Sequence, residues 1–146
     1  MKHTTIRALT RAEDWLEAYP IMHQLRTHLT EEEYLHLVAE AVDVDRYLLY
    51  ALYEAEDIAA VVGFKEMTTL YNGRFIWVCD LITDKEKRSL GYGEKLLMFV
   101  HNYARKNDIE RVSLSSGLQR RDAHRFYEDK MGYAKTSYVF LKQVSN

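Results

Sequence analysis

Hydrophobic and polar positions along the chain follow two different periods. Thr4–Leu9 is expected to form a first strand. After Thr10 and again after Thr30, apolar residues recur every three or four positions, which is the spacing of amphipathic helices. Each threonine precedes a glutamate by three positions, Glu13 and Glu33, and this pairing is typical of a capping box. The single proline lies inside the first helical pattern, so we expect a kink or a break there.

The middle of the chain is rich in strand-forming residues. They dominate positions 47–53, 58–70 and 75–82. Asn72-Gly73 joins the last two runs in a tight turn, because these residue types accept the positive φ angles that such turns require. The third run is almost continuously apolar, which predicts a strand buried on both faces.

The last third alternates between helix and strand. We expect a helix over 93–107, a strand over 111–115, a helix over 120–131 ended by Gly132, and a final strand or hairpin over 133–144. The resulting order is β-α-α-β-β-β-α-β-α-β. This order predicts an α/β (mixed α+β) fold in which helices cover the faces of a mixed sheet.

Length and composition narrow the class of protein. The chain has 146 residues, 47% of them hydrophobic, which suits a single domain over residues 1–146. One cysteine excludes a disulfide scaffold. No apolar run approaches the roughly 20 residues of a membrane helix, and the start has no secretory pattern. We therefore expect a cytoplasmic protein with no membrane partner.

Charge is distributed unevenly along the sequence. Residues 10–57 carry twelve acidic and three basic side chains, a net charge of −9, whereas residues 58–146 have a net charge of +5. One half is expected to attract cations and the other anions, unless both are only solvated surfaces. A nucleic-acid partner is not expected, because the overall charge is −2 and no basic-aromatic face is evident.

Two glycines mark the joint between the buried strand and the helix after it. The run Arg88-Ser89-Leu90-Gly91-Tyr92-Gly93 lies there, with further lysines at 85, 87 and 95. Glycine lets a backbone approach a ligand, and a helix start offers unpaired N–H groups, so the run predicts a phosphate cradle. An ordinary strand-to-helix turn is the alternative. No Gly-Lys-Ser/Thr follows, and Leu96 replaces the third glycine of a dinucleotide motif.

Two motifs in this order resemble the GNAT superfamily of N-acetyltransferases. The first is R-x-x-G-x-G at Arg88–Gly93, after the apolar strand that ends in Asp80-Leu81-Ile82-Thr83. The second, Asp122–Glu128 followed by Met131-Gly132-Tyr133, is similar to that family's A-x-x-F-Y-E-x-x-G-F/Y helix. Residues 119–127 are close to the aminoalkylphosphonate acetyltransferase branch. Arg120 stands where many members have asparagine, so that contact does not carry over.

The resemblance implies a fold, a co-substrate and a set of site residues. The implied fold is a single GNAT-like domain, with a mixed, mostly antiparallel sheet of six or seven strands splayed at its centre and about four helices. Acetyl-CoA is the implied co-substrate. Its pantetheine arm is expected along Leu81, Ile82 and Thr83, and its pyrophosphate on backbone N–H groups of the cradle; the cradle residues are Arg88, Gly91, Tyr92, Gly93 and Glu94. Tyr127 is placed to donate a proton to the leaving thiolate.

Asp80 is the only charged residue between Phe75 and Ile82. Desolvation in an apolar strand would raise the pKa of its carboxyl group and suit it to act as a general base for the amine. The alternative is a structural aspartate at a bulge, bound to a backbone N–H or an arginine. Cys79 is expected to be a small core residue and not a nucleophile, and no metal site is expected.

The expected function is transfer of acetyl from acetyl-CoA directly to a small-molecule primary amine, a cationic one. A protein or peptide amine and a non-catalytic acyl-CoA sensor remain alternatives. The cationic acceptor follows from the acidic helices, where Glu31 and Glu32 are the expected substrate-binding residues. The aromatic run 138–140 is suited to pairing across a homodimer.

Overall fold

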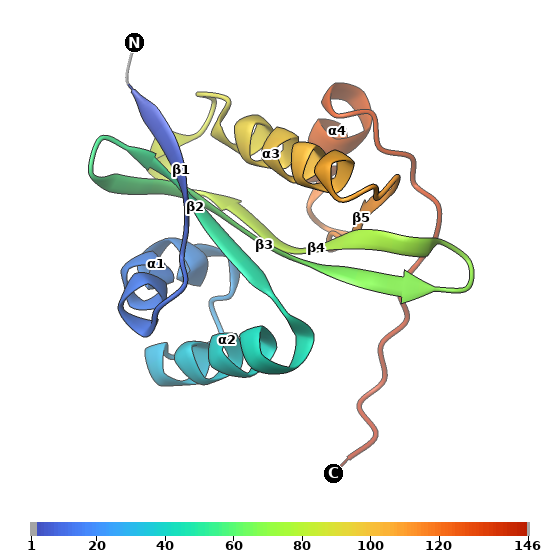
Figure 1. Ribbon diagram of the computed structural model, residues 1–146, viewed down its shortest axis with the longest axis horizontal. Coiled ribbons are helices and arrows are strands. Elements are labelled where there is room, and N and C mark those ends of the chain that lie inside the picture. Colours follow the sequence, from blue (N-terminus) through green and yellow to red (C-terminus); the bar gives the residue numbers. More distant parts are fainter. Residues whose placement is uncertain (1–2, 146) are drawn as a thin grey trace. The chain divides into compact units, whose positions relative to one another are not determined.

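The computed structural model describes residues 3–145, which divide into two compact units with the boundary between Leu114 and Ser115. The first unit contains a five-stranded sheet in the order β1-β2-β3-β4-β5 (Figure 1). Its strands are β1 (Thr4–Ala8), β2 (Leu48–Glu54), β3 (Asp57–Thr69), β4 (Gly73–Thr83) and β5 (Val112–Leu114). All neighbours are antiparallel except β4 and β5. The predicted mixed, mostly antiparallel sheet is confirmed.

Helices cover both faces of this sheet. The helices α1 (Ala12–Leu25) and α2 (Glu31–Asp45) lie on one face, and α3 (Tyr92–Lys106) lies on the other (Figure 1). The short 3₁₀ turn η1 (Lys85–Lys87) precedes α3. Residues of β3 serve both faces: Val61 belongs to the core beneath α1 and α2, while the Phe64 ring meets Tyr103 of α3.

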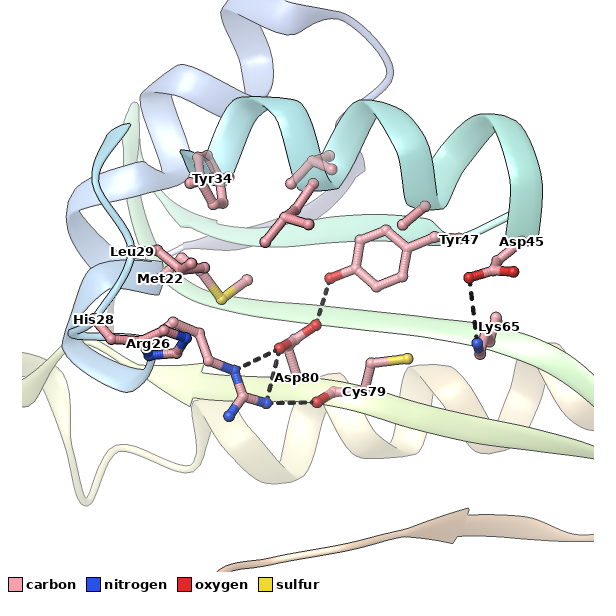
Figure 2. Close-up of a pocket in the computed structure, with 13 residues that line it drawn as sticks. Met22, Arg26, His28, Leu29, Tyr34, Asp45, Tyr47, Lys65, Cys79 and Asp80 are labelled. Atoms are coloured by element: carbon pink, nitrogen blue, oxygen red, sulfur yellow. Dashed lines mark hydrogen bonds and ion pairs between the residues drawn. The ribbon is translucent and has the colours of Figure 1, made fainter. Parts of the chain in front are cut away.

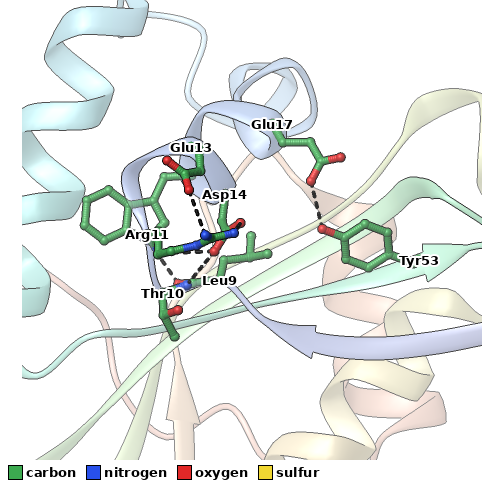
Figure 3. Close-up of polar contacts among 8 residues, drawn as sticks. Leu9, Thr10, Arg11, Glu13, Asp14, Glu17 and Tyr53 are labelled. Carbon is green, nitrogen blue, oxygen red and sulfur yellow. Dashed lines mark hydrogen bonds and ion pairs between the residues drawn. The ribbon is translucent and has the colours of Figure 1, made fainter.

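The first helix differs from its prediction at its start, and of the kink or break expected at its proline the break is absent. Its N-cap is Arg11 and not Thr10, and Asp14 Oδ2 accepts the backbone N–H groups of both residues at 3.2 Å (Figure 3). Glu13, the predicted capping residue, instead forms an ion pair with Arg11 at 2.9 Å. The helix also continues through Pro20. Burial of its inner face against the sheet outweighs the single hydrogen bond that proline removes.

The second unit contains α4 (Arg121–Arg125), the π-helical turn η2 (Phe126–Lys130) and an extended tail. Gly132 ends this helical segment with φ +76°, as predicted. The predicted strand over 133–144 is wrong: those residues form no helix or strand, so the described sheet has five strands and not six or seven. A strand requires a neighbour for its N–H and C=O groups, and the described part of this unit has no other strand.

Candidate active site

A pocket of about 400 Å³ lies between α1, α2 and the adjoining face of the sheet (Figure 2). Its walls come from one stripe of α2, where Tyr34, Leu37, Val38 and Ala41 follow helical spacing. The pocket is completed by residues from α1, the α1–α2 joint, the end of α2 and three strands or strand starts: Met22, Arg26, His28, Leu29, Asp45, Tyr47, Lys65, Cys79 and Asp80. The walls are thus largely apolar, and the polar groups lie at the ends and on the floor.

Asp80 lies on the floor of this pocket and is held by two side chains. Arg26 contacts Asp80 Oδ1 through Nε at 3.0 Å and Nη2 at 2.9 Å, and the Tyr47 hydroxyl donates to Asp80 Oδ2 at 2.7 Å (Figure 2). The pairing of β3 with β4 shifts here, because Gly63 faces Asp80 while Phe64 faces Val78. Asp80 therefore adjoins a bulge and binds an arginine, which are both features of the structural alternative.

Tyr47 reaches Asp80 because Gly63 has no side chain. A Cβ atom built on Gly63 would lie 1.7 Å from the Tyr47 hydroxyl oxygen, so the ring occupies the space that any other residue would fill. Tyr47 is itself buried. Burial and the neighbouring Asp80 raise the pKa of its hydroxyl well above the usual range, so Tyr47 keeps its proton at physiological pH and donates a hydrogen bond to Asp80 Oδ2.

Cys79 is the residue that bulges out of register beside Asp80. Burial, followed by the Asp80 charge, raises the pKa of its thiol to about 11. Only a thiolate is an effective nucleophile, so the raised pKa makes Cys79 a poor nucleophile near neutral pH. The chemistry of this cysteine favours direct transfer over an acetyl-cysteine intermediate.

The backbone edge of β4 opens at the same place. Within the described residues of Met1–Leu114, β5 pairs with β4 at Ile76–Val78 and no further. Beyond that point β4 continues to Thr83, bonded to β3 on its other side only. The pairing between β4 and β5 thus ends before Cys79, in the region where the splay of the sheet was expected. Leu81, Ile82 and Thr83 thus present one backbone edge to which an extended ligand can hydrogen-bond.

The glycine joint forms a tight loop at the start of α3. Gly91 is the N-cap with φ +82°, and Ser89 also has a positive φ of +68°. A Cβ atom on Gly91 would meet no protein atom within 4 Å, so the space beside it is open. Tyr92, Gly93 and Glu94 form the first turn of α3, where backbone N–H groups have no helical partner. The loop has the backbone geometry expected of a phosphate cradle.

A buried carboxylate ties this loop to the sheet. Glu54, at the end of β2, is 6% exposed and accepts the Tyr92 hydroxyl and the Lys87 ammonium. These hydrogen bonds raise the pKa of both donors. Lys87 is one of the lysines near the glycine run, and its ammonium group forms an ion pair with Glu54. Sequence reasoning missed Glu54, because it belongs to the acidic run 54–57 that indicates a solvated turn.

Tyr127 belongs to the second unit, in the π-helical turn. It is buried, and its ring lies 5.4 Å from that of Phe126 and 6.1 Å from that of Tyr133, measured between centroids. Burial raises the pKa of its hydroxyl, and the Arg120 charge lowers it by a smaller amount. The hydroxyl is therefore protonated near neutral pH, and its role as a proton donor stays a prediction.

The predicted acidic residues of α2 lie away from Asp80. Glu31 and Glu32 start α2, and Glu32 lines a second, shallower hollow of about 370 Å³ that shares Leu29 and Leu37 with the main pocket. Asp45 lines the main pocket but pairs with Lys65 at 3.5 Å. The substrate-binding role of Glu31 and Glu32 stays a prediction.

Residues 9–133 match the Acetyltransferase (GNAT) family. The chain belongs to the GNAT family of acetyltransferases. This acetyltransferase is 47% identical over 139 residues to "Uncharacterized N-acetyltransferase YhdJ" of Bacillus subtilis (strain 168), across 95% of this chain and 98% of the relative. The match extends across both compact units, and it confirms the predicted acyltransferase class.

Solved structures of acetyltransferases share the fold. Aminoglycoside N-acetyltransferase AAC(6')-Iy in complex with CoA is similar with a TM-score of 0.84 and 12% identity, over 98% of this chain and 95% of that one. The aminoglycoside acetyltransferase meta-AAC0020 from an uncultured soil metagenomic sample, in complex with sisomicin, has a TM-score of 0.82 and 13% identity. That match covers 98% of this chain and 97% of the other. At such identities the likeness is one of fold.

Two further features bear on the class of site. Among residues 3–145, His, Cys, Asp and Glu side chains form no group of three that could hold a metal ion. In the same part of the chain, no helix combines the length and the apolar character needed to cross a membrane.

Proposed function

We propose that this acetyltransferase moves the acetyl group of acetyl-CoA to a small-molecule primary amine that arrives as a cation. One observation carries the proposal. Cys79 and Asp80 line the pocket and also begin the stretch of β4 that β5 leaves unpaired. A donor bound along that edge and an amine bound in the pocket would therefore meet at one point of the sheet.

The residues present fit the donor. The open backbone edge of Leu81, Ile82 and Thr83 suits the amide groups of a pantetheine arm, which bind like an added strand. The N–H groups from Arg88 to Glu94 suit a pyrophosphate, since Gly91 leaves open space at a helix start. When bound, the thioester supplies the activated acetyl group.

The chain's residues would manage the protons of the reaction. An ammonium ion must lose a proton before its nitrogen can form the new C–N bond, and the Asp80 carboxylate is the candidate base, directly or through water. As the C–S bond breaks, the thiolate needs a proton, and the buried Tyr127 hydroxyl is the candidate donor. Cys79 is assigned no step, because burial raises the pKa of its thiol and disfavours the nucleophilic thiolate.

The pocket volume of about 400 Å³ lies within the range of small-ligand sites, which is consistent with a small-molecule acceptor. The test is an amine panel with acetyl-CoA, following free-thiol release and measuring acetyl-CoA affinity by calorimetry. We expect thiol release with at least one small amine. Tight acetyl-CoA binding without thiol release from any amine or lysine peptide would instead identify a sensor.

The same panel tests Glu31 and Glu32. Exposed carboxylates act on a cation mainly during encounter, and salt screens them over about 8 Å at physiological ionic strength. Their joint change to glutamine should lower kcat/KM for the amine at low salt, and high salt should remove the difference.

A further inference from the structure

We infer that the pocket selects a primary amine carried on an apolar aryl or alkyl body, and not a polyhydroxylated amino sugar or a polyamine. The inference rests on the proposed function, because it names the class of acceptor for that site. Three properties of the pocket support it: the composition of its walls, the pairing of its charges and the position of its one deep carboxylate.

The walls offer apolar contact along the length of α2. Tyr34, Leu37, Val38 and Ala41 follow helical spacing and form a continuous stripe. Met22 and Leu29 lie across the pocket from α2 (Figure 2). Leu37 is 51% exposed, so a large apolar side chain stands at the mouth without cover from the protein. Sugar hydroxyls placed against such walls would lose their hydrogen bonds to water without replacement. An aryl or alkyl body would gain by burial.

The charges inside the pocket neutralise one another. Its two carboxylates each have a cationic partner, Arg26 for Asp80 and Lys65 for Asp45. A second or third ammonium group on the acceptor would have to displace one of these cations. The pocket is therefore suited to one positive charge and not to several.

Asp80 marks the place for that single charge. An ionised carboxylate has about four acceptor sites, and Arg26 Nε, Arg26 Nη2 and the Tyr47 hydroxyl use three of them. The remaining site can accept an ammonium N–H. The head group then lies beside the open edge of β4, and the body extends along α2. The volume suits amines of up to about a dozen non-hydrogen atoms.

The experiment compares straight-chain alkylamines and arylalkylamines with glucosamine and spermidine under the same conditions. We expect kcat/KM to rise about 4-fold for each added methylene until the pocket is full, because each buried methylene contributes that much to binding. Glucosamine and spermidine should be poorer than hexylamine by 10-fold or more. A flat alkylamine series, or preference for either polar amine, would overturn the inference while leaving the acetyltransferase intact.

A matched pair of variants ties the selectivity to this pocket. Ala41→Leu fills part of the apolar wall, whereas Ala39→Leu adds the same side chain to an exposed position of α2. Ala41→Leu should lower kcat/KM for the longest amines 10-fold or more and leave the shortest ones within 2-fold. Ala39→Leu should change neither. Equal effects on short and long amines would contradict the assignment.

Amine binding provides a readout that does not need turnover. Calorimetric titration of the alkylamine series into the protein with coenzyme A present should show affinity rising with chain length, and Ala41→Leu should remove that rise. If no amine is acetylated but this trend appears, the proposed function fails and the ligand class holds. If amines are acetylated without the trend, the ligand class fails.

Discussion

The ring of Tyr47 occupies the position that a side chain on Gly63 would fill, and from there its hydroxyl donates to Asp80. The two residues lie on neighbouring strands or strand ends, and the sheet glycine is what allows the tyrosine to lie flat. The floor of the pocket thus depends on an absent Cβ atom. Arg26 completes the arrangement from the α1–α2 joint.

Gly63→Ala should displace Tyr47 and break its hydrogen bond to Asp80. Overpacking at this buried position is expected to lower the free energy of unfolding by about 1–3 kcal/mol. Urea denaturation measures the loss. In the double variant Tyr47→Ala/Gly63→Ala the clash is absent, so the two changes should be strongly non-additive. Additive losses would show that Tyr47 and Gly63 do not compete for the same space.

Asp80→Asn tests the general base. The amide cannot take the proton of an ammonium substrate, so turnover near pH 7 should fall by about 10²–10⁴-fold. A free primary amine has a pKa of about 10, so the defect should shrink as pH rises toward that value and the amine loses its proton unaided. The measurement is kcat against pH for both proteins. Wild-type activity at all pH values would leave Asp80 only its structural contacts with Arg26 and Tyr47.

Gly91→Val and Gly93→Val should abolish acetyl-CoA binding, because the added side chains occupy the space expected for the pyrophosphate. Calorimetry gives the affinity, and circular dichroism checks the fold. Gly73→Val is the matched control, since Gly73 also has a positive φ (+69°) and open space but lies in the β3–β4 turn. Unchanged affinity in a folded Gly91→Val/Gly93→Val protein would remove the cradle assignment.

Glu54→Gln should make the glycine loop less rigid, although Glu54 itself is not expected to contact acetyl-CoA. It removes the ion pair with Lys87 and weakens the acceptor of the Tyr92 hydroxyl, so the start of α3 is held less firmly. We expect coenzyme A affinity to fall roughly 5- to 10-fold, with the KM for the amine unchanged. Glu56→Gln, in the exposed turn beside it, is the control. A shift in amine KM alone would argue that Glu54 serves the pocket instead.

Tyr127→Phe removes only a hydroxyl group. If that group protonates the leaving thiolate, kcat should fall about 10²-fold or more while acetyl-CoA affinity persists. Because burial raises the pKa of Tyr127, the wild-type profile should show no loss from its ionisation below its ordinary pKa of about 10. Retained turnover in the variant would make Tyr127 a packing residue.

Most of the secondary structure followed from local patterns. The second helix begins at the predicted capping box of Thr30 and Glu33, and the Asn72-Gly73 turn has its glycine at positive φ. These features depend on a few neighbouring residues, so the sequence indicates them directly. The first helix begins one residue later than predicted, because Asp14 and not Glu13 accepts the backbone N–H groups of Thr10 and Arg11.

The chain's own sequence determined the family, the order of the elements, the glycine loop and the isolated charge at Asp80. Only the tertiary structure shows which residues each of these features contacts. Arg26 lies 54 positions from Asp80 and Tyr47 lies 33, and Glu54 lies 38 positions from Tyr92. The prediction of a C-terminal strand was wrong for the same reason. Its residues favour a strand, but a strand forms only where a neighbouring strand can pair with it. Local patterns encode propensity, whereas partners are chosen by the path of the whole chain.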